Sequence, residues 1–329
     1  MQRISPTLFQ LVNQLNNLQI HSGESLAKTL KISRNAVWKH IQQLLKYDID
    51  VSSLHGQGYQ LKEPLNLLES IQFSSLLVAP GISIQQIEIY GSIASTNDEV
   101  RALPKPRENH LVFCLAEHQT QGRGRFERKW ISPFGKNIML SARVFLNKDM
   151  SSLGGLSLAI SLAIRKTIED LGIPGARCKW PNDIYYCDKK LSGVLIEAYA
   201  ESHGLTELVI GIGLNVNMVH STKTESIGKP WTSFQEITSM PHSRTKIALK
   251  LIENLSAYLK RFLDHSFENF SDEWKTHDFL KDQFIRLKIG NDEISGVARG
   301  TDSLGHLKME DSEGKIKTYS AGEASCCST

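Results

Sequence analysis

The sequence predicts an α+β protein built from three units: a small helical unit closed by a β-hairpin, a mixed α/β unit and a small β-barrel. Three observations predict this arrangement. Apolar residues repeat with helical spacing over 5–45, helix and strand patterns mix from about 67 to 277, and short strands separated by glycine turns fill 282 to about 320. The expected unit boundaries are 1–64, 65–277 and 278–329.

Composition limits the classes of protein that this chain can belong to. With 40% hydrophobic residues, 22% charged residues and a mean hydropathy of −0.24, it has enough apolar surface to offset the entropy lost on folding. The apolar stretch 205–214 is too short to span a bilayer, and the N-terminus lacks the apolar core of a secretory signal. We therefore expect no membrane partner.

Net charge and cysteine content bear on the possible partners and on the compartment of the protein. The net charge is only +3, so any argument for nucleic-acid binding must rest on local charge. Five cysteines without a Cys-x-x-Cys pair argue against a disulfide framework or a zinc site. We expect reduced thiols and a cytoplasmic location.

The first unit should contain three helices and a hairpin. Ser5-Pro6, Ser22 and Ser33 are helix-start signals, because a serine hydroxyl can accept a hydrogen bond from the first free backbone N–H groups. The glycine-rich turn 55–58 separates two short strands within 51–61. The residues expected on the inner faces of the helices are Leu8, Leu11, Val12, Leu15, Leu26, Leu30, Ala36, Val37, Ile41, Leu44 and Leu45.

This layout is typical of a winged helix-turn-helix, which places its recognition helix in the major groove of DNA. Arg34 and Asn35 stand at the start of the third helix, where contact with base edges is easiest. Lys39 and His40 are expected to meet phosphates. The alternative is a helical unit that contacts proteins.

In the central unit, stretches with the helical spacing of apolar residues alternate with stretches typical of strands. The tail consists of short strands. Strands are expected at 88–90, 111–113, 138–144, 193–199 and 208–217, helices at 153–171 and 245–264, and tail turns at 290–292, 300–302 and 313–314.

The most informative run is 119–130, which carries four cations and one carboxylate. Gly122 and Gly124 allow the backbone to approach a ligand and to expose its N–H groups. The neighbouring arginines suit a phosphate or a carboxylate, because the guanidinium is a planar fork. No Gly-Lys-Ser/Thr follows, so the run is not a P-loop. The alternative is an exposed basic loop that binds nucleic acid.

Two further runs contain candidate functional residues. In 179–183, followed by 189–193, a lysine at the mouth of a strand can supply a desolvated positive charge. The alternative is that Lys189 and Lys190 form a solvated turn. The Gly-x-Gly of 211–217 is weak evidence of function, since it also marks close strand packing.

Taken together and in this order, the runs resemble biotin–protein ligases of the bifunctional type, which also repress the biotin operon. The resemblance rests on 95–97, the Gly-Arg-Gly-Arg run, 179–183 with Lys190 seven residues beyond Asp183, and 211–215. It implies a winged helix-turn-helix, a class II synthetase-like catalytic domain and an SH3-like C-terminal β-barrel.

The resemblance also implies the reaction. Biotin attacks the α-phosphate of Mg²⁺-bound ATP to give biotinyl-5′-AMP, and a lysine of a biotin carboxyl carrier protein then takes the biotin. The adenylate is expected to favour a homodimer that binds operator DNA. A lipoate–protein ligase, a ligand-sensing repressor with a decayed centre and a class II tRNA-synthetase-like protein are the alternatives.

Residue roles follow from the same resemblance. Asp183 is a candidate for orienting Lys190 or the incoming amine, and no metal ligand is assigned. The expected biotin-pocket residues are Ser95, Thr96, Asn97 and Gln119, with Arg123, Gly124 and Arg125 in a loop that closes over biotin and phosphate, Lys190 at biotin's carboxylate and the α-phosphate, and Trp231 on adenine.

Two departures from the family pattern stand out. Glu127 replaces a usual glycine, and the resulting carboxylate is expected to alter loop closure or to pair with Arg128. Cys326 and Cys327 stand where a relative carries a basic residue that reaches the nucleotide, so a C-terminal contact to ATP is not carried over from the family.

Overall fold

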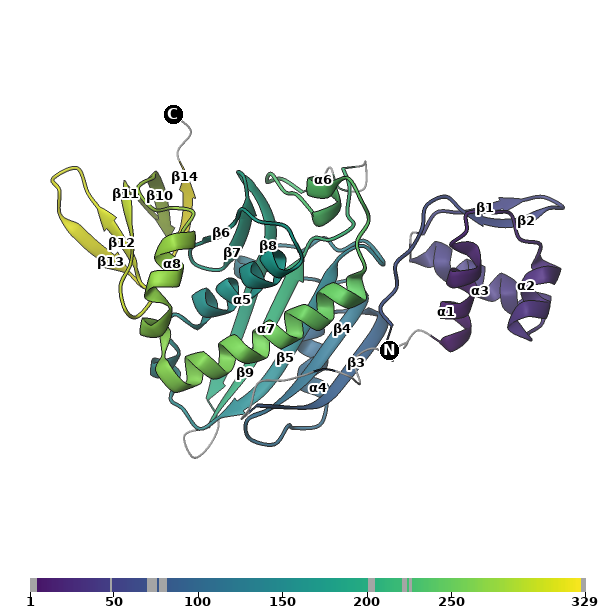
Figure 1. Ribbon diagram of the computed structural model, residues 1–329, viewed down its shortest axis with the longest axis horizontal. Helices are drawn as coiled ribbons and strands as arrows, with labels where there is room; N and C mark the ends of the chain where they lie inside the picture. The colour runs from purple at the N-terminus through teal and green to yellow at the C-terminus, as the bar shows by residue number, and fades with distance from the viewer. Residues whose placement is uncertain are drawn as a thin grey trace.

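A computed structural model describes residues 5–47, 49–69, 76, 82–200, 205–220, 224 and 227–326. Figure 1 shows a large central sheet with the N-terminal helical unit at one end and a small sheet at the other. Within these ranges, no helix is both long enough and apolar enough to cross a bilayer.

The N-terminal unit has the predicted elements. They are α1 (Pro6–Leu15), α2 (Gly23–Leu30), α3 (Arg34–Lys46), β1 (Val51–Leu54) and β2 (Gly58–Leu61). The hydroxyls of Ser5, Ser22 and Ser33 accept hydrogen bonds from backbone N–H groups and cap the three helices, as expected. One prediction is wrong: Leu45 is 42% exposed, because the adjacent Leu44 already occupies the inner face of α3. Ala36 is only half-buried.

The central sheet is mixed and has seven strands. Only β3 and β4 run parallel, and every other neighbouring pair in it is antiparallel. Two of its strands, β6 and β7, were not expected from the sequence. In sheet order the strands are β3 (Ser83–Ile93), β4 (His110–Gln119), β5 (Ile138–Leu146), β9 (Thr206–Leu214), β8 (Lys189–Ala200), β7 (Asp183–Tyr186) and β6 (Ala176–Lys179).

Helices cover both faces of this sheet. The long helices α5 (Leu156–Asp170) and α7 (Arg244–His265) lie across one face, and α4 (Thr96–Ala102) lies on the other (Figure 1). The remaining helical segments are η2 (Arg125–Glu127), η3 (Met150–Leu153), α6 (Phe234–Thr238), η6 (Phe267–Phe270) and α8 (Ser271–His277).

The helix predicted for 153–171 begins three residues late. Gly155 has a φ of +76°, and a Cβ there would lie 2.4 Å from the ring of Phe267. This close approach requires glycine, and the left-handed backbone separates η3 from α5.

The tail forms a five-stranded antiparallel sheet in the order β13-β12-β11-β10-β14. A register shift between Ala298 and Thr301 interrupts the pairing of β11 with β12. The strand β14 lies beyond the expected end of the strands near residue 320. The strands are β10 (Phe284–Ile289), β11 (Asp292–Thr301), β12 (Leu307–Glu310), β13 (Ile316–Tyr319) and β14 (Glu323–Cys326).

The described residues form two large hydrophobic cores. One joins the central sheet, α5, α7 and the tail sheet, and the other fills the helical unit and includes Leu65, Leu67 and Phe134. The predicted α+β class is therefore confirmed, while the unit boundaries stay predictions.

Candidate active site

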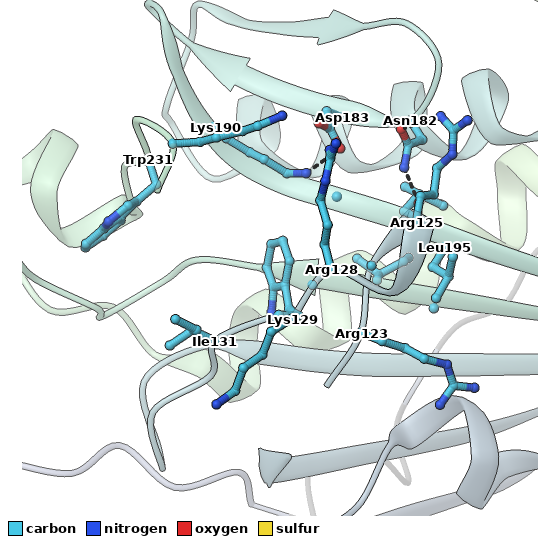
Figure 2. Close-up of a pocket in the computed structure, with 18 of the residues that line it drawn as sticks. Arg123, Arg125, Arg128, Lys129, Ile131, Asn182, Asp183, Lys190, Leu195 and Trp231 are labelled. Carbon is cyan, nitrogen blue, oxygen red and sulfur yellow. Dashed lines mark hydrogen bonds and ion pairs between the residues drawn. The ribbon is translucent and has the colours of Figure 1, made fainter. Parts of the chain in front are cut away.

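A pocket of about 640 Å³ opens where α4, the loop 121–131, the β7–β8 hairpin, β9, the loop 227–231 and β14 meet. Figure 2 shows the cationic side chains of the loop 121–131 and Lys190 of β8 around it. Every residue expected in the central site lines it: Ser95, Thr96, Asn97, Gln119, Arg123, Gly124, Arg125, Asp183, Lys190 and Trp231.

A chain of buried hydrogen bonds forms one wall. The backbone N–H and the hydroxyl of Thr96 both donate to Gln119 Oε1, at 2.7 and 2.9 Å. Ser141 Oγ lies 2.6 Å from Asn97 Oδ1, and Asn97 Nδ2 donates to Glu197 at 2.8 Å. Ser141 and Glu197 were missed, because they lie inside apolar strand patterns. The wall holds the polar groups at the start of α4 in fixed orientations.

The Gly-x-Gly of β9 makes room for this wall. A Cβ at Gly211 would lie 2.3 Å from Asn97 Oδ1, and one at Gly213 would lie 2.4 Å from the indole of Trp130. Both glycines therefore admit a pocket residue against the sheet, which is a more specific role than strand packing alone.

Lys190 and Asp183 form an ion pair inside the pocket. Lys190 Nζ donates to Asp183 Oδ1 at 2.6 Å, as the dashed line in Figure 2 shows. The ammonium also lies 5.6 Å from the ring centroid of Trp130. Because the Lys190 side chain is only 26% exposed, the solvated-turn alternative is wrong for it.

Trp231 lies beside Lys190 because their backbones pair. Lys190 N–H donates to Pro230 O, and Thr232 N–H donates to Lys190 O. The Trp231 ring is 5% exposed and rests on His220, with the ring centroids 4.1 Å apart. Part of the loop between these two aromatic residues lies outside the described residues.

Arg123 is held by two carboxylates. It donates to both oxygens of Asp98, at 2.6 and 2.7 Å, and to Glu197 at 3.1 Å. Hydrogen bonding to Asp98 raises the pKa of Arg123, and the same contact lowers the pKa of Asp98. Its guanidinium extends away from Lys190 in Figure 2, so this structure does not place it over a phosphate.

Arg125 reaches toward both the central sheet and the tail. It donates to Asn182 Oδ1 at 3.3 Å and to the carbonyl of Gly322 at 3.1 Å. Burial lowers the pKa of Arg125. Residues from the loop, from the central sheet and from the start of β14 thus close one side of the pocket.

Glu323, the first residue of β14, pairs with two more cations of the pocket. Arg128 donates to both of its oxygens, and Lys229 Nζ lies 2.6 Å from its Oε1. Hydrogen bonding from Arg128, and then from Lys229, lowers the pKa of Glu323 to about 2. Of the two alternatives for Glu127, the pairing with Arg128 is wrong, since the carboxylate partner comes from the tail sheet, and the effect on loop closure stays a prediction. Cys326 lies at the end of the same strand, and Cys327 lies outside the described residues.

Lys179 is a further pocket cation that received no role from the sequence. It donates to the Tyr185 hydroxyl at 3.2 Å, and burial lowers its pKa. Lys179 is part of the motif 179–183, but only the folded sheet shows that its side chain lines the pocket.

Metal ligands are not evident in the pocket. In the part of the chain that the structure describes, no three His, Cys, Asp or Glu side chains gather closely enough to hold a metal ion. Asp183 and Glu323 are already paired with cations.

The candidate DNA surface is the outer face of α3. Arg34, Asn35 and Lys39 are exposed there, and His40 is half-buried. Trp38, 50% exposed, lies on the same helix.

Two protein families match the chain, one over the central unit and one over the N-terminal unit. Residues 90–215 match the Biotin/lipoate A/B protein ligase family, and residues 7–60 match an HTH domain. The fold and the pocket therefore define a ligase of the biotin/lipoate type joined to a helix-turn-helix domain.

Similar proteins narrow this class. The Bifunctional ligase/repressor BirA of Salmonella typhimurium is 36% identical over 316 residues, covering 96% of each chain. BirA of Bacillus subtilis is 29% identical and covers 95% of this chain and 96% of its own. The structure of Biotin protein ligase from Aquifex aeolicus in complex with biotin and ATP covers 74% of this chain and 100% of that chain, with 28% identity and a TM-score of 0.62. The chain belongs to the family of bifunctional biotin ligases and repressors.

Proposed function

We propose that the protein joins biotin to ATP as biotinyl-5′-AMP, transfers the biotin to a lysine of a biotin carboxyl carrier protein, and represses transcription at an operator. The observation that carries the ligase assignment is the single pocket lined both by Lys190, fixed by Asp183, and by the hydrogen-bonded wall of Thr96, Asn97 and Gln119.

The pocket suits a reaction between two anions. A carboxylate and a triphosphate repel each other, so they meet only where cations and oriented N–H groups offset that repulsion. The wall around Asn97 offers polar groups to the ureido end of biotin, and Lys190 supplies a positive charge to its carboxylate and to the α-phosphate. Asp183 orients Lys190, and Trp231 provides an aromatic face for adenine.

Arg123 and Arg125 are proposed to hold the loop 121–131 over the product. The adenylate is a reactive mixed anhydride, so a closed loop protects it from water and from unintended amines. Magnesium enters with ATP, where it neutralises phosphate charge. No residue of this chain is assigned to it.

The ligase proposal has a direct test. Purified protein is incubated with biotin and Mg²⁺-ATP, and bound biotinyl-AMP is measured by mass spectrometry, followed by transfer to a carrier domain. Lys190→Ala should reduce adenylate formation by about 100-fold or more, because a preorganised charge is lost. Lys189→Ala, at the exposed neighbour, is the matched control.

Two alternative functions are separated in the same assay. Formation of lipoyl-AMP without biotinyl-AMP would instead identify a lipoate ligase. Biotin binding without any adenylate would support a ligand-sensing repressor.

For the repressor activity, we propose that α3 reads operator DNA. Lys39→Ala should weaken binding to all sequences and lower the salt dependence, because a phosphate contact is lost. Arg34→Ala should in addition relax sequence preference. Lys315→Ala, on the distant tail sheet, is the control. The absence of any salt-dependent DNA retention would contradict the proposal.

We also propose that the adenylate favours a homodimer, so that two α3 helices meet a two-fold operator. The central sheet supports this, because β3 is one of its two edge strands and pairs only with β4 among the described strands. Ligand-dependent dimerisation is measured by sedimentation with and without biotinyl-AMP. DNA binding and reduced thiols favour a cytoplasmic location.

A further inference from the structure

Phe126 is an aromatic residue at the lip of the pocket. It lines the opening, yet it is 63% exposed, more than any other large hydrophobic side chain in the described residues. The guanidinium carbons of Arg125 and Arg128 lie 5.0 and 5.8 Å from its ring centroid. The ring is therefore flanked by cations and faces solvent.

The backbone at this position is unfavourable for a bulky residue. Phe126 has φ 56° and ψ 39°, and Glu127 follows with φ 55°. Both lie in the left-handed region, which side chains with a Cβ rarely adopt. Burial of the ring does not offset the strain, because the ring is exposed. Strain retained at a pocket opening indicates a functional constraint.

The loop holds Phe126 in this position from both sides. Arg123 is fixed to Asp98 and Glu197 before it, and Arg128 is fixed to Glu323 after it. Gly124 N–H also donates to Arg128 O at 2.7 Å, which closes the turn. The exposed ring is thus presented on an anchored loop.

We propose that Phe126 is a docking residue for the protein that accepts biotin. This inference rests on the proposed function, in which a carrier lysine must reach the acyl group through the pocket opening. An exposed aromatic ring on an anchored loop is a typical anchor for a partner protein. Arg128 and Lys229 beside it already share Glu323, whereas Lys129 is a further exposed cation at the opening, and its charge favours a partner whose target lysine is flanked by an apolar spot and an acidic residue.

The test separates adenylate formation from transfer. In Phe126→Ala, the KM for the carrier domain should rise about ten-fold or more, whereas the KM for biotin in adenylate formation should change much less. Phe126→Leu keeps an apolar side chain and should restore most of the carrier affinity. Phe284→Ala, which removes a 55% exposed ring from β10 outside the pocket, is the matched control.

Three outcomes are decisive. An unchanged carrier KM in Phe126→Ala overturns the docking role. A rise in the biotin KM, or faster escape of the adenylate, with unchanged carrier affinity also overturns it and makes Phe126 a lid over the ligand. If the wild-type protein forms no adenylate, the proposed function fails instead, which the first half of the assay detects independently.

Discussion

Single glycines decide whether the polar wall of the pocket can form. At Gly211, the backbone of β9 approaches Asn97 so closely that a methyl group would overlap the amide oxygen. Asn97 cannot move aside easily, because Ser141 and Glu197 hold it and it is 4% exposed.

Gly211→Ala is therefore expected to displace Asn97. Biotin affinity should fall at least ten-fold, and the free energy of unfolding should fall by about 1–3 kcal/mol, as for other overpacked sites. Calorimetric titration with biotin and thermal unfolding measure the two effects. Gly23→Ala, at a glycine outside the pocket, is the control, since a Cβ there meets only the ring of Tyr59 at an ordinary contact distance of 3.7 Å. Equal biotin affinity in both variants would contradict this role.

At the scale of the element, the loop 121–131 is closed by long-range contacts. Arg125 donates to Asn182, 57 residues away, and to Gly322, 197 residues away. These bonds tie the basic loop to the central sheet and to the residue before β14, while the intervening residues line the pocket.

Arg125→Gly should loosen the loop and release the activated intermediate. The loss of both side-chain bonds, together with a more flexible glycine, leaves the pocket open more often. Free adenylate should then label amines of proteins other than the carrier, which is measured by detecting biotin on added serum albumin. Unchanged off-target labelling would count against Arg125 as a closing residue.

At the scale of the whole molecule, two junctions connect the units. Tyr47, at the end of α3, stacks on Phe134 with the ring centroids 4.7 Å apart, and Lys136 pairs with Glu63 at 2.8 Å. Phe134 lies just beyond the pocket loop 121–131 in the sequence, so the helical unit rests on the segment that continues from the candidate active site.

Phe134→Ala should destabilise the helical unit. The ring is 4% exposed, and removal of a buried phenylalanine costs about 3–5 kcal/mol. The transition of the helical unit, followed by circular dichroism during urea unfolding, should shift to lower urea. Phe284→Ala removes an exposed ring and should leave that transition in place.

The second junction lies between the central sheet and the tail, where Asp278 pairs by its backbone with Cys178 and carries a buried carboxyl group. Asp278 is 1% exposed, and its Oδ2 has no hydrogen-bond partner among the described residues. Its Oδ1 accepts a hydrogen bond from Leu280 N–H at 2.9 Å. Burial raises the pKa of Asp278 from 3.8 to about 6.

This raised pKa predicts a pH dependence of stability. Between pH 4 and 6 the folded protein keeps a proton that the unfolded chain releases, so the free energy of unfolding falls as pH rises. The loss is on the order of 3 kcal/mol and is complete above pH 6. Asp278→Asn should remove this slope in urea unfolding at pH 4, 5 and 7. Asp292→Asn, at an exposed carboxyl, should retain it.

Much of this molecule follows from local sequence. Serine hydroxyls at positions 5, 22 and 33 begin the N-terminal helices, because capping depends on residues within one turn. The glycine- and arginine-rich run and Lys190 indicated the pocket, since a site for anions requires cations and an exposed backbone.

The tertiary structure decided which partner each charged group takes. Arg123 pairs with Asp98 and Glu197, and Arg128 pairs with Glu323, which lies 195 residues later in the chain. The folding of the central unit brings the first set together, and the packing of the tail sheet against that unit brings the second pair together. Sequence patterns report the periodicity of neighbouring residues, whereas a charged side chain binds whatever the folded chain places within reach.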